Sequence, residues 1–262
     1  MGRFSPKQGT YAIRKIGGKD RTFLLTEGYD SFNPSLLGLG DITQPAVSAD
    51  AIAAVFDLEG FTNFCKQIEP QLSVPHFLSE FLSWLLGDIR REMTQRQDPD
   101  GALLYGPLPF FVKFMGDGLL LLWDVASTDD VGRRNIVLSS YEVCEHYQST
   151  FLPRIRATTV EAPPRLRCGL ARGTVYSVGN GQDFVGSCIN MSARIQKLPG
   201  VTFAFNRRGF NLEDSGADEF FKETVVVKRL SIRGIGENEL VAVLRKDYEA
   251  LIQTDRTHFR DL

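Results

Sequence analysis

KFMGDGLLLLWD, residues 113–124, is the most informative segment of the chain for its fold. Its second half is a run of bulky apolar residues, which is typical of a buried strand. The Gly-Asp-Gly before this run, with Asp117 at its centre, indicates a tight turn. Together with the apolar residues 109–114, the stretch predicts a hairpin at the centre of a sheet. This hairpin places a carboxylate at the end of a core strand.

A second apolar run, residues 51–58, predicts a central strand that reaches another carboxylate, Asp57. If this strand neighbours the hairpin, Asp57 and Asp117 converge at one end of the sheet. Two carboxylates with little positive charge nearby would repel, and one would take up a proton. Mg²⁺ or Mn²⁺ removes that conflict, because these ions bind carboxylates, water and substrate phosphates. The structural alternative is that Asp57 caps a helix and Asp117 forms a turn.

The rest of the chain alternates between helical and extended patterns. We expect helices at 61–68, 75–93 (starting at Pro75), 129–151 (capped by Asp129 or Asp130) and 185–198. We expect strands at 166–179, broken in two at Gly173, and at 201–205 and 239–244, with a loop at 96–102. This order predicts an α+β sandwich with its helices on one face of the sheet.

Composition limits the classes of protein that fit. The chain has 262 residues, of which 43% are hydrophobic, enough for one sizeable core with an extension. A net charge of -2 argues against a general nucleic-acid binder. The four cysteines form no CxxC pair and are expected to be buried reduced thiols, and three unclustered histidines argue against a zinc site. No stretch reaches the ~18 to 20 apolar residues that span a bilayer. With no signal-peptide pattern, a cytoplasmic protein is expected.

Three segments are expected along the chain. Residues 1–48 are rich in Gly, Pro, Ser and Asn, and predict an arm that packs on the main domain or on a partner subunit. Residues 49–246 would form the main domain, and residues 247–262 a C-terminal tail.

Four motifs in order carry a resemblance. FDLEGFT (56–62) and VKFMGDGLLLLW (112–123) resemble the class III nucleotidyl cyclases. DFVGSCINMSARI (183–195) resembles the segment with that family's transition-state residues, and LSIRGIGENELVAVL (230–244) its basic turn before the last strand. The resemblance covers residues 50 to 245. The segment DLEGFTNFC (57–65) further resembles the bacterial pyrimidine (uridylate or cytidylate) cyclases of the Pycsar anti-phage systems.

The resemblance implies a ferredoxin-like sandwich, with a central antiparallel-type sheet and helices packed on it, in a head-to-tail homodimer with shared active sites. Asp57 and Asp117 would hold two Mn²⁺ or Mg²⁺ ions per site, with the backbone carbonyl of Leu58 as a further ligand. Phe61 and Thr62 would begin a helix whose amides receive triphosphate oxygens.

The resemblance also implies the groups that stabilise the transition state. Asn190 and Arg194 lie four residues apart on one helix face, and would bind the ribose and the reacting phosphate. Arg233 stands where the family usually has a lysine for the terminal phosphates, although Lys228 and Arg229 are close in sequence. The structural alternative for Arg194 is a surface ion pair.

The sequence does not decide which nucleobase is recognised. Lys113 and Asp183 match the pair that recognises adenine in adenylyl cyclases, although Lys113 could also be a solvated lysine on the hairpin. A lysine could equally donate to uracil O2 or O4, and a carboxylate could accept from uracil N3–H. A smaller base would need filling by a bulky neighbour such as Phe56, Phe114 or Phe184.

The expected reaction converts UTP to 3′,5′-cyclic UMP and pyrophosphate by attack of the ribose 3′-hydroxyl, as a second messenger in anti-phage defence. The alternatives are cyclic AMP from ATP and cyclic CMP from CTP. No protein nucleophile is required, and the sequence shows no Ser-His or Cys-His constellation. A catalytically silent cyclase-like domain is the competing class. The presence of Asp57, Asp117, Asn190 and Arg194 argues against it.

Overall fold

The structure is a computed structural model of the chain, and it describes residues 11–24, 29–126, 128–210 and 218–262. The chain divides into two compact units, one of Met1–Ser48 with Tyr176–Val185, and one of Ala49–Val175 with Gly186–Leu262. The boundaries of the arm, the main domain and the tail expected from the sequence stay predictions.

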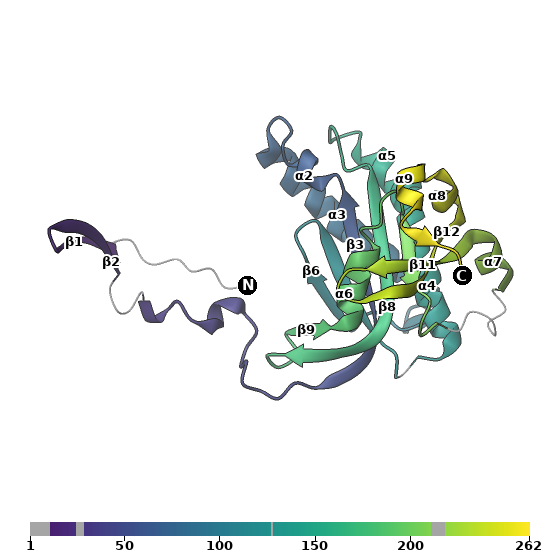
Figure 1. Ribbon diagram of the computed structural model, residues 1–262, viewed down its shortest axis with the longest axis horizontal. Helices are drawn as coiled ribbons and strands as arrows, with labels where there is room; N and C mark the ends of the chain where they lie inside the picture. Colours follow the sequence, from purple (N-terminus) through teal and green to yellow (C-terminus); the bar gives the residue numbers. More distant parts are fainter. Residues whose placement is uncertain (1–10, 25–28, 127, 211–217) are drawn as a thin grey trace. The chain divides into compact units, whose positions relative to one another are not determined.

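A nine-stranded sheet dominates the described residues, in the order β13-β11-β12-β10-β8-β3-β7-β6, with β9 paired to β8 off this path (Figure 1). Its strands are β3 (Ser48–Glu59), β6 (Phe111–Phe114), β7 (Gly118–Asp124), β8 (Arg165–Val178), β9 (Asp183–Gly186), β10 (Phe203–Asn206), β11 (Val225–Ile232), β12 (Gly236–Leu244) and β13 (Phe259–Arg260). β3 and β6 pair with β7 antiparallel, and β12 pairs antiparallel with β10 and β11, whereas β10 is parallel to β8. This confirms the predicted antiparallel-type sheet.

The helices of the described residues are α2 (Phe61–Phe64), α3 (Pro70–Met93), α4 (Asp130–His146), α5 (Leu152–Ile155), α6 (Ser187–Ile195), α7 (Asp218–Thr224), α8 (Arg245–Ala250) and α9 (Gln253–Arg256). A 3-10 turn, η1 (Pro34–Leu37), and a π turn, η2 (Tyr147–Phe151), accompany them. Two small hairpins, β1 (Tyr11–Ile16) with β2 (Lys19–Leu24) and β4 (Thr94–Asp98) with β5 (Gly101–Leu104), form separate sheets. No helix among the described residues is long and apolar enough to cross a membrane.

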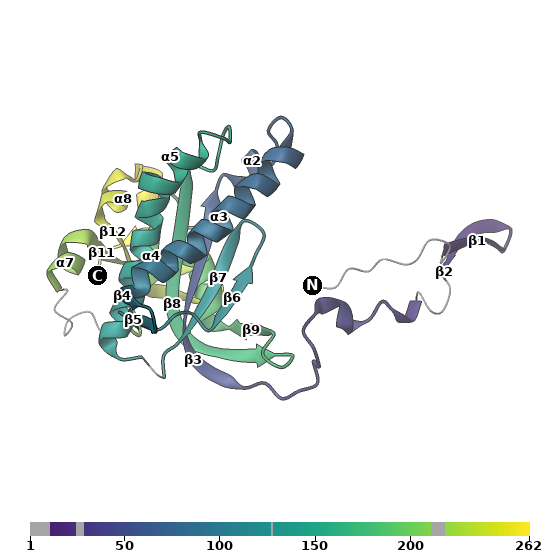
Figure 2. The same cartoon turned by 180° about the vertical axis from the view of Figure 1, so that it is seen from behind.

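The main core lies between one face of the sheet and helices α3 and α4, which Figure 2 shows in front of the strands. On α3 the residues at every fourth position, Phe77, Phe81, Leu85, Ile89 and Met93, are at most 4% exposed. This spacing gives the helix one continuous apolar stripe. Each fully buried side chain of this size contributes roughly 1.5–3 kcal/mol.

Helix α6 packs on the opposite face, so the predicted placement of all helices on one face is wrong (Figure 1). Its buried residues Cys188, Met191 and Ile195 lie outside the main core cluster. The helix approaches β8 so closely that a Cβ on Gly169 would lie 2.4 Å from the carbonyl oxygen of Ser192. Alternation along β3 puts Phe56 in the main core and Asp57 on the other side of the sheet.

The hairpin over β6 and β7 is confirmed. Its turn is closed by a hydrogen bond from the amide of Met115 to the carbonyl of Gly118, at 2.9 Å. Gly116 has φ +95°, a conformation that favours glycine. Gly118 pairs with Asp57, and a Cβ there would lie 1.9 Å from the carbonyl oxygen of Phe56. Both glycines are therefore required by the turn that brings Asp117 beside β3.

Several predicted helix limits need correction. The second helix starts at Pro70 rather than Pro75, because Pro70 occupies the first helical turn and Pro75 lies inside the helix. The predicted helix 61–68 is a single turn, α2. The predicted helix 129–151 is α4 followed by the π turn η2, and the side chain of Asp129 caps it by accepting from the amide of Gly132, as expected.

Three strand predictions also differ from the structure. The expected loop at 96–102 is the β4–β5 hairpin, in which Asp98 pairs with Gly101 across the turn. The two strands predicted over 166–179 are one strand, β8 (Arg165–Val178). Gly173 does not break β8 but allows close contact, since a Cβ there would lie 3.3 Å from Cβ of Cys188. Strand β11 was not predicted, and β1 and β2 give the expected irregular arm a regular hairpin.

Candidate active site

The two predicted metal ligands, Asp57 and Asp117, lie side by side at one end of β3. The amide of Leu58 donates to the carbonyl of Asp117 at 3.1 Å, which ties the hairpin turn to β3. The side chain of Asp57 is only 14% exposed, and that of Asp117 is half-buried. The convergence expected from the sequence is therefore present.

A cavity of about 300 Å³ opens beside the two carboxylates. It is lined by Asp57, Leu58, Gly60, Phe61, Thr62, Asn63, Asp117, Arg167 and Lys197. The five predicted site residues in this set are Asp57, Leu58, Phe61, Thr62 and Asp117. Gly60, at φ +81°, turns the chain from β3 into α2 and so places Phe61 and Thr62 at the cavity wall.

Arg167, on β8, is an unpredicted member of the site. Its Nη2 donates to Oδ2 of Asp57 at 2.5 Å, and the two side chains are 17% and 14% exposed. Its Nε is buried and has no hydrogen-bond partner among the described residues. The guanidinium therefore supplies the counter-charge of Asp57 and retains an unused donor near the cavity.

The pKa of Asp117 is raised above its usual value, first by burial and then by the negative charge of Asp57. The positive charges of Lys197 and Arg167 oppose this rise without cancelling it. The two basic residues therefore do not fully offset the effects of burial and of Asp57 on Asp117. A bound cation would relieve that repulsion.

Lys197 is the second residue lining the cavity that was not predicted from the sequence. It follows α6 directly, and its amide donates to the carbonyl of Arg194 at 3.1 Å. Asn190, Arg194 and Lys197 stand at positions i, i+4 and i+7, a spacing that could have identified it. For Arg167 the available signal was the alternation of Arg165 and Arg167 with the buried Leu166 along β8.

The predicted transition-state residues lie outside this cavity. Asn190 and Arg194 are both exposed on α6, and neither side chain has a hydrogen-bond partner within the described residues. Arg233 is exposed in the turn between β11 and β12. Its neighbour Lys228 is engaged elsewhere, donating to Asp261 at 2.6 Å and lying 4.5 Å from the centre of the Tyr248 ring.

The predicted base-recognition residues are not brought together in one described unit. Lys113 is half-buried on β6, in the larger unit, and Asp183 begins β9, in the smaller one. Phe56 was expected to fill space beside a small base, but it is 0% exposed and belongs to the main core. Strand alternation explains this, since Phe56 and Asp57 point to opposite faces. Phe114, by contrast, is 46% exposed.

The donor set at the cavity fits a hard divalent cation. Carboxylate and carbonyl oxygens are the ligands that Mg²⁺ and Mn²⁺ prefer, and Asp57, Asp117 and the backbone of Leu58 offer them at one place. The pKa of Asp117 is raised by burial first and by the charge of Asp57 second, and a bound cation would oppose both effects. Asp57 is paired with Arg167, so a cation would share or take over that contact.

Comparisons with known proteins bear on the fold. No protein-family model matches the chain, and no curated protein matches it. A bacterial light-regulated adenylyl cyclase has a TM-score of 0.51 at 14% identity, covering 79% of this chain and 54% of its own. The catalytic core of a rhodopsin-guanylyl cyclase with converted specificity, in complex with ATPαS, has a TM-score of 0.52 at 17% identity, covering 77% of this chain and 98% of its own.

At these identities the likeness concerns the fold. The chain therefore has the fold of class III cyclases, as its four motifs predicted. The chain spans 54% of the length of the light-regulated protein.

Proposed function

We propose that the protein is a nucleotidyl cyclase, which converts a nucleoside triphosphate into a 3′,5′-cyclic nucleotide and pyrophosphate. The observation that carries the proposal is the cavity in which Asp57 and Asp117 meet Arg167 and Lys197, at the end of β3 in a class III cyclase fold. Two carboxylates for cations beside two basic side chains for phosphates suit a metal-bound triphosphate.

Each residue has a defined part in the reaction. Asp57, Asp117 and the carbonyl of Leu58 would hold the divalent cations, and Arg167 and Lys197 would attract the triphosphate. Bound cations would supply positive charge for the attacking 3′-oxygen and for the phosphates. The 3′-oxygen bonds to the α-phosphorus, the bond to the β-phosphate oxygen breaks, and the hydroxyl proton leaves to solvent.

The remaining groups are proposed to come from a second copy of the chain. Asn190 and Arg194 are exposed, have no side-chain partner within the described residues, and do not line the cavity of their own chain. A head-to-tail homodimer would bring them to the ribose and the α-phosphate of the partner's site. Arg233 would bind the terminal phosphates, since Lys228 is held by Asp261.

The proposed substrate is UTP, and the product, cyclic UMP, would act as a messenger in anti-phage defence. Support comes from the likeness of DLEGFTNFC to the pyrimidine cyclases of such systems. Lys113 and Asp183 instead favour ATP as the second candidate, with CTP the remaining pyrimidine. A base that leaves two buried polar groups unpaired loses about 1–3 kcal/mol for each, or roughly a hundredfold in total.

The test is kcat/KM for UTP, CTP, ATP and GTP with Mn²⁺, the products being identified by mass. The proposal expects cyclic UMP as the preferred product. A preference for ATP of about tenfold or more, which corresponds to roughly 1.4 kcal/mol, would establish the adenylyl cyclase instead. Absence of all four cyclic products, from protein shown to be folded and dimeric, would support the silent domain and refute the cyclase.

A Lys113→Met variant separates base recognition from metal binding. It should lower kcat/KM for the preferred base while leaving the Mn²⁺ concentration for half-maximal rate unchanged. Val112→Ala, at the exposed neighbouring position on β6, is the matched control and should change neither.

A further inference from the structure

A second group of potential metal ligands lies between α3 and α4, on the opposite side of the sheet from Asp57. Asp88, Glu92 and His146 each offer one ligand atom, and these three atoms lie within 4.8 Å of one another. None of the three lines the cavity at Asp117. We propose that Asp88, Glu92 and His146 form a second metal site, for a borderline divalent cation such as Zn²⁺.

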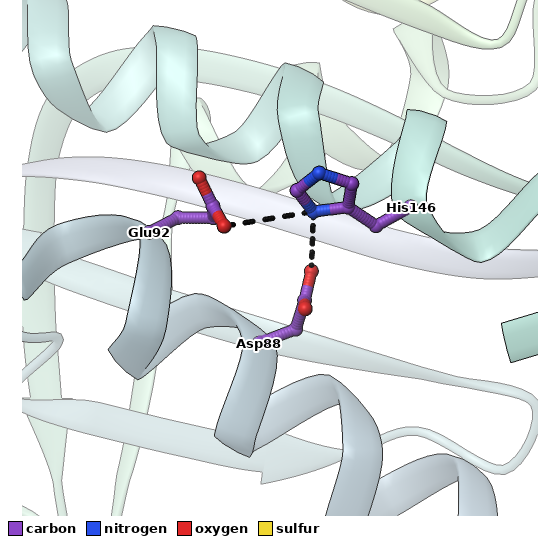
Figure 3. A group of neighbouring side chains, drawn as sticks. All are labelled: Asp88, Glu92 and His146. Atoms are coloured by element: carbon purple, nitrogen blue, oxygen red, sulfur yellow. Dashed lines mark hydrogen bonds and ion pairs between the residues drawn. The ribbon is translucent and has the colours of Figure 1, made fainter. Parts of the chain in front are cut away.

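The geometry of the three ligand atoms suits such an ion. His146 Nδ1 lies 3.1 Å from Asp88 Oδ2 and 3.6 Å from Glu92 Oε1, and Figure 3 shows both carboxylates directed at this one nitrogen. Ligands at about 2.0–2.2 Å from a tetrahedral zinc ion are roughly 3.3–3.6 Å apart. Asp88 and Glu92 are one turn apart on α3, so both face α4 without distortion of the helix.

Burying these charged side chains without a cation would destabilise the folded protein. The side chain of Asp88 is 0% exposed, and the one cation that contacts it among the described residues is the guanidinium of Arg91. Glu92 and His146 are only 22% and 26% exposed. A buried carboxylate is stable when a cation or several hydrogen-bond donors neutralise it.

The guanidinium of Arg91 occupies the position of a cation in this group. It forms an ion pair with Asp88 Oδ1, its Nε lies 3.2 Å from Glu92 Oε1, and its Nη2 lies 3.2 Å from His146 Nδ1. A neutral Nδ1 would accept from Arg91 but face two carboxylates, whereas a protonated Nδ1 would suit the carboxylates but face Arg91. A metal ion on Nδ1 satisfies all three ligands at once, and Arg91, 60% exposed, can turn to solvent.

A small cavity gives access to the group and offers it a further ligand. It measures about 220 Å³ and is lined by Glu92, Tyr105, Asn135, Leu138, Ser139 and Glu142. Glu142 stands one turn before His146 on α4 and lines the cavity beside Glu92. The cavity leaves room for water or Glu142 in a fourth position. A nitrogen ligand also distinguishes this site from the all-oxygen site at Asp57, which suits Mg²⁺.

The site can be observed directly, without measuring turnover. The chain has three histidines, His76, His146 and His258, so the imidazole nitrogens can be assigned by ¹H–¹⁵N NMR with His76→Gln and His258→Gln variants. Added Zn²⁺ should change the ¹⁵N chemical shift of His146 Nδ1 to a value typical of a metal-bound imidazole nitrogen. The chemical shifts of the other two histidine rings should not change. A His146 resonance that does not move with stoichiometric Zn²⁺, or a shift confined to the other histidines, would overturn the proposal.

Two variants test the individual roles. Glu92→Gln keeps the shape of a partly exposed side chain but removes its charge, and should weaken Zn²⁺ binding by about tenfold or more in a chelator competition. Arg91→Met removes the competing cation and should strengthen binding by about tenfold or more. Arg90→Met, at the exposed neighbouring position on α3, is the matched control and should bind as wild type does. Equal affinities for the Arg91 and Arg90 variants would refute the competition with the guanidinium.

Discussion

Replacing Arg167 with methionine tests the charge balance of the candidate active site. The ion pair from Arg167 Nη2 to Asp57 Oδ2 is 2.5 Å long, with both side chains less than one-fifth exposed. Its loss leaves Asp57 and Asp117 without their nearest counter-charge. We expect the metal-free protein to lose about 1–3 kcal/mol in its free energy of unfolding, between the values for exposed and fully buried pairs.

The same variant should bind Mg²⁺ more tightly. Two unit charges roughly 4 Å apart repel by about 1–4 kcal/mol for effective dielectric constants of 80 down to 20. Removing the guanidinium removes this repulsion, so the dissociation constant should fall by at least about fivefold. Since a ligand stabilises a protein by RT ln(1 + [L]/Kd), Mg²⁺ should raise the unfolding free energy of Arg167→Met more than that of the wild type.

Calorimetric titration of Mg²⁺ and urea unfolding with and without Mg²⁺ measure these two effects. The matched control is Arg165→Met, since Arg165 lies two residues away on β8 and its Nε is 3.3 Å from Glu59 Oε2, in a pair about one-third exposed. Arg165→Met should lower the free energy of unfolding by less than about 1 kcal/mol and leave the affinity for Mg²⁺ unchanged. If Arg167→Met binds Mg²⁺ no more tightly than Arg165→Met, Arg167 is not the competing cation of a metal site.

Three further predictions concern the same site. Asp57→Ala or Asp117→Ala should each abolish cyclic nucleotide formation with the circular dichroism spectrum retained, and undiminished turnover with Mn²⁺ would exclude the metal role. Mixing Asp57→Ala with Arg194→Ala protein should restore part of the activity, because one site of the heterodimer is intact; no rescue after proven subunit exchange would place all groups in one chain. Since the pKa of Asp117 is raised from 3.8, its contribution to stability is fully present below that value and is lost as the pH rises through the raised pKa. Mg²⁺ affinity should rise over the same pH range, and both effects should vanish in Asp117→Asn, as titrations at several pH values would show.

The parts of the fold that could be predicted are those in which local signals agree. Gly116 and Gly118 are demanded by the hairpin turn, and the apolar run after them forms β7 beside β3. Because the turn and the pairing with β3 were both readable, the meeting of Asp57 and Asp117 was predicted correctly. Pro75 misled because a proline can stand inside a helix near its start, and the signal that began α3 was Pro70.

The errors in the site come from tertiary packing or from a neglected alternation. Arg167 meets Asp57 across 110 positions of sequence, and only the neighbouring placement of β8 and β3 in the sheet brings them together. His146 likewise reaches Asp88 from the next long helix, so the absence of clustered histidines in the sequence was no guide to its surroundings. The wrong prediction for Phe56 could have been avoided, because a strand that directs Asp57 to the cavity directs the neighbouring side chain into the core.

Helix α6 offers a physical reason for the proposed sharing of the site between two chains. Lys197, just beyond its end, lines the cavity of its own chain with Asp57 and Asp117. Asn190 and Arg194, earlier on the same stripe, are exposed and lie outside that cavity. A helix rises about 1.5 Å per residue, so Asn190 and Lys197 are separated by roughly 10 Å along its axis. One stripe can therefore supply a phosphate-binding charge to its own site and transition-state groups to a partner's site. This arrangement explains why the charge of Lys197 opposes the rise in the pKa of Asp117.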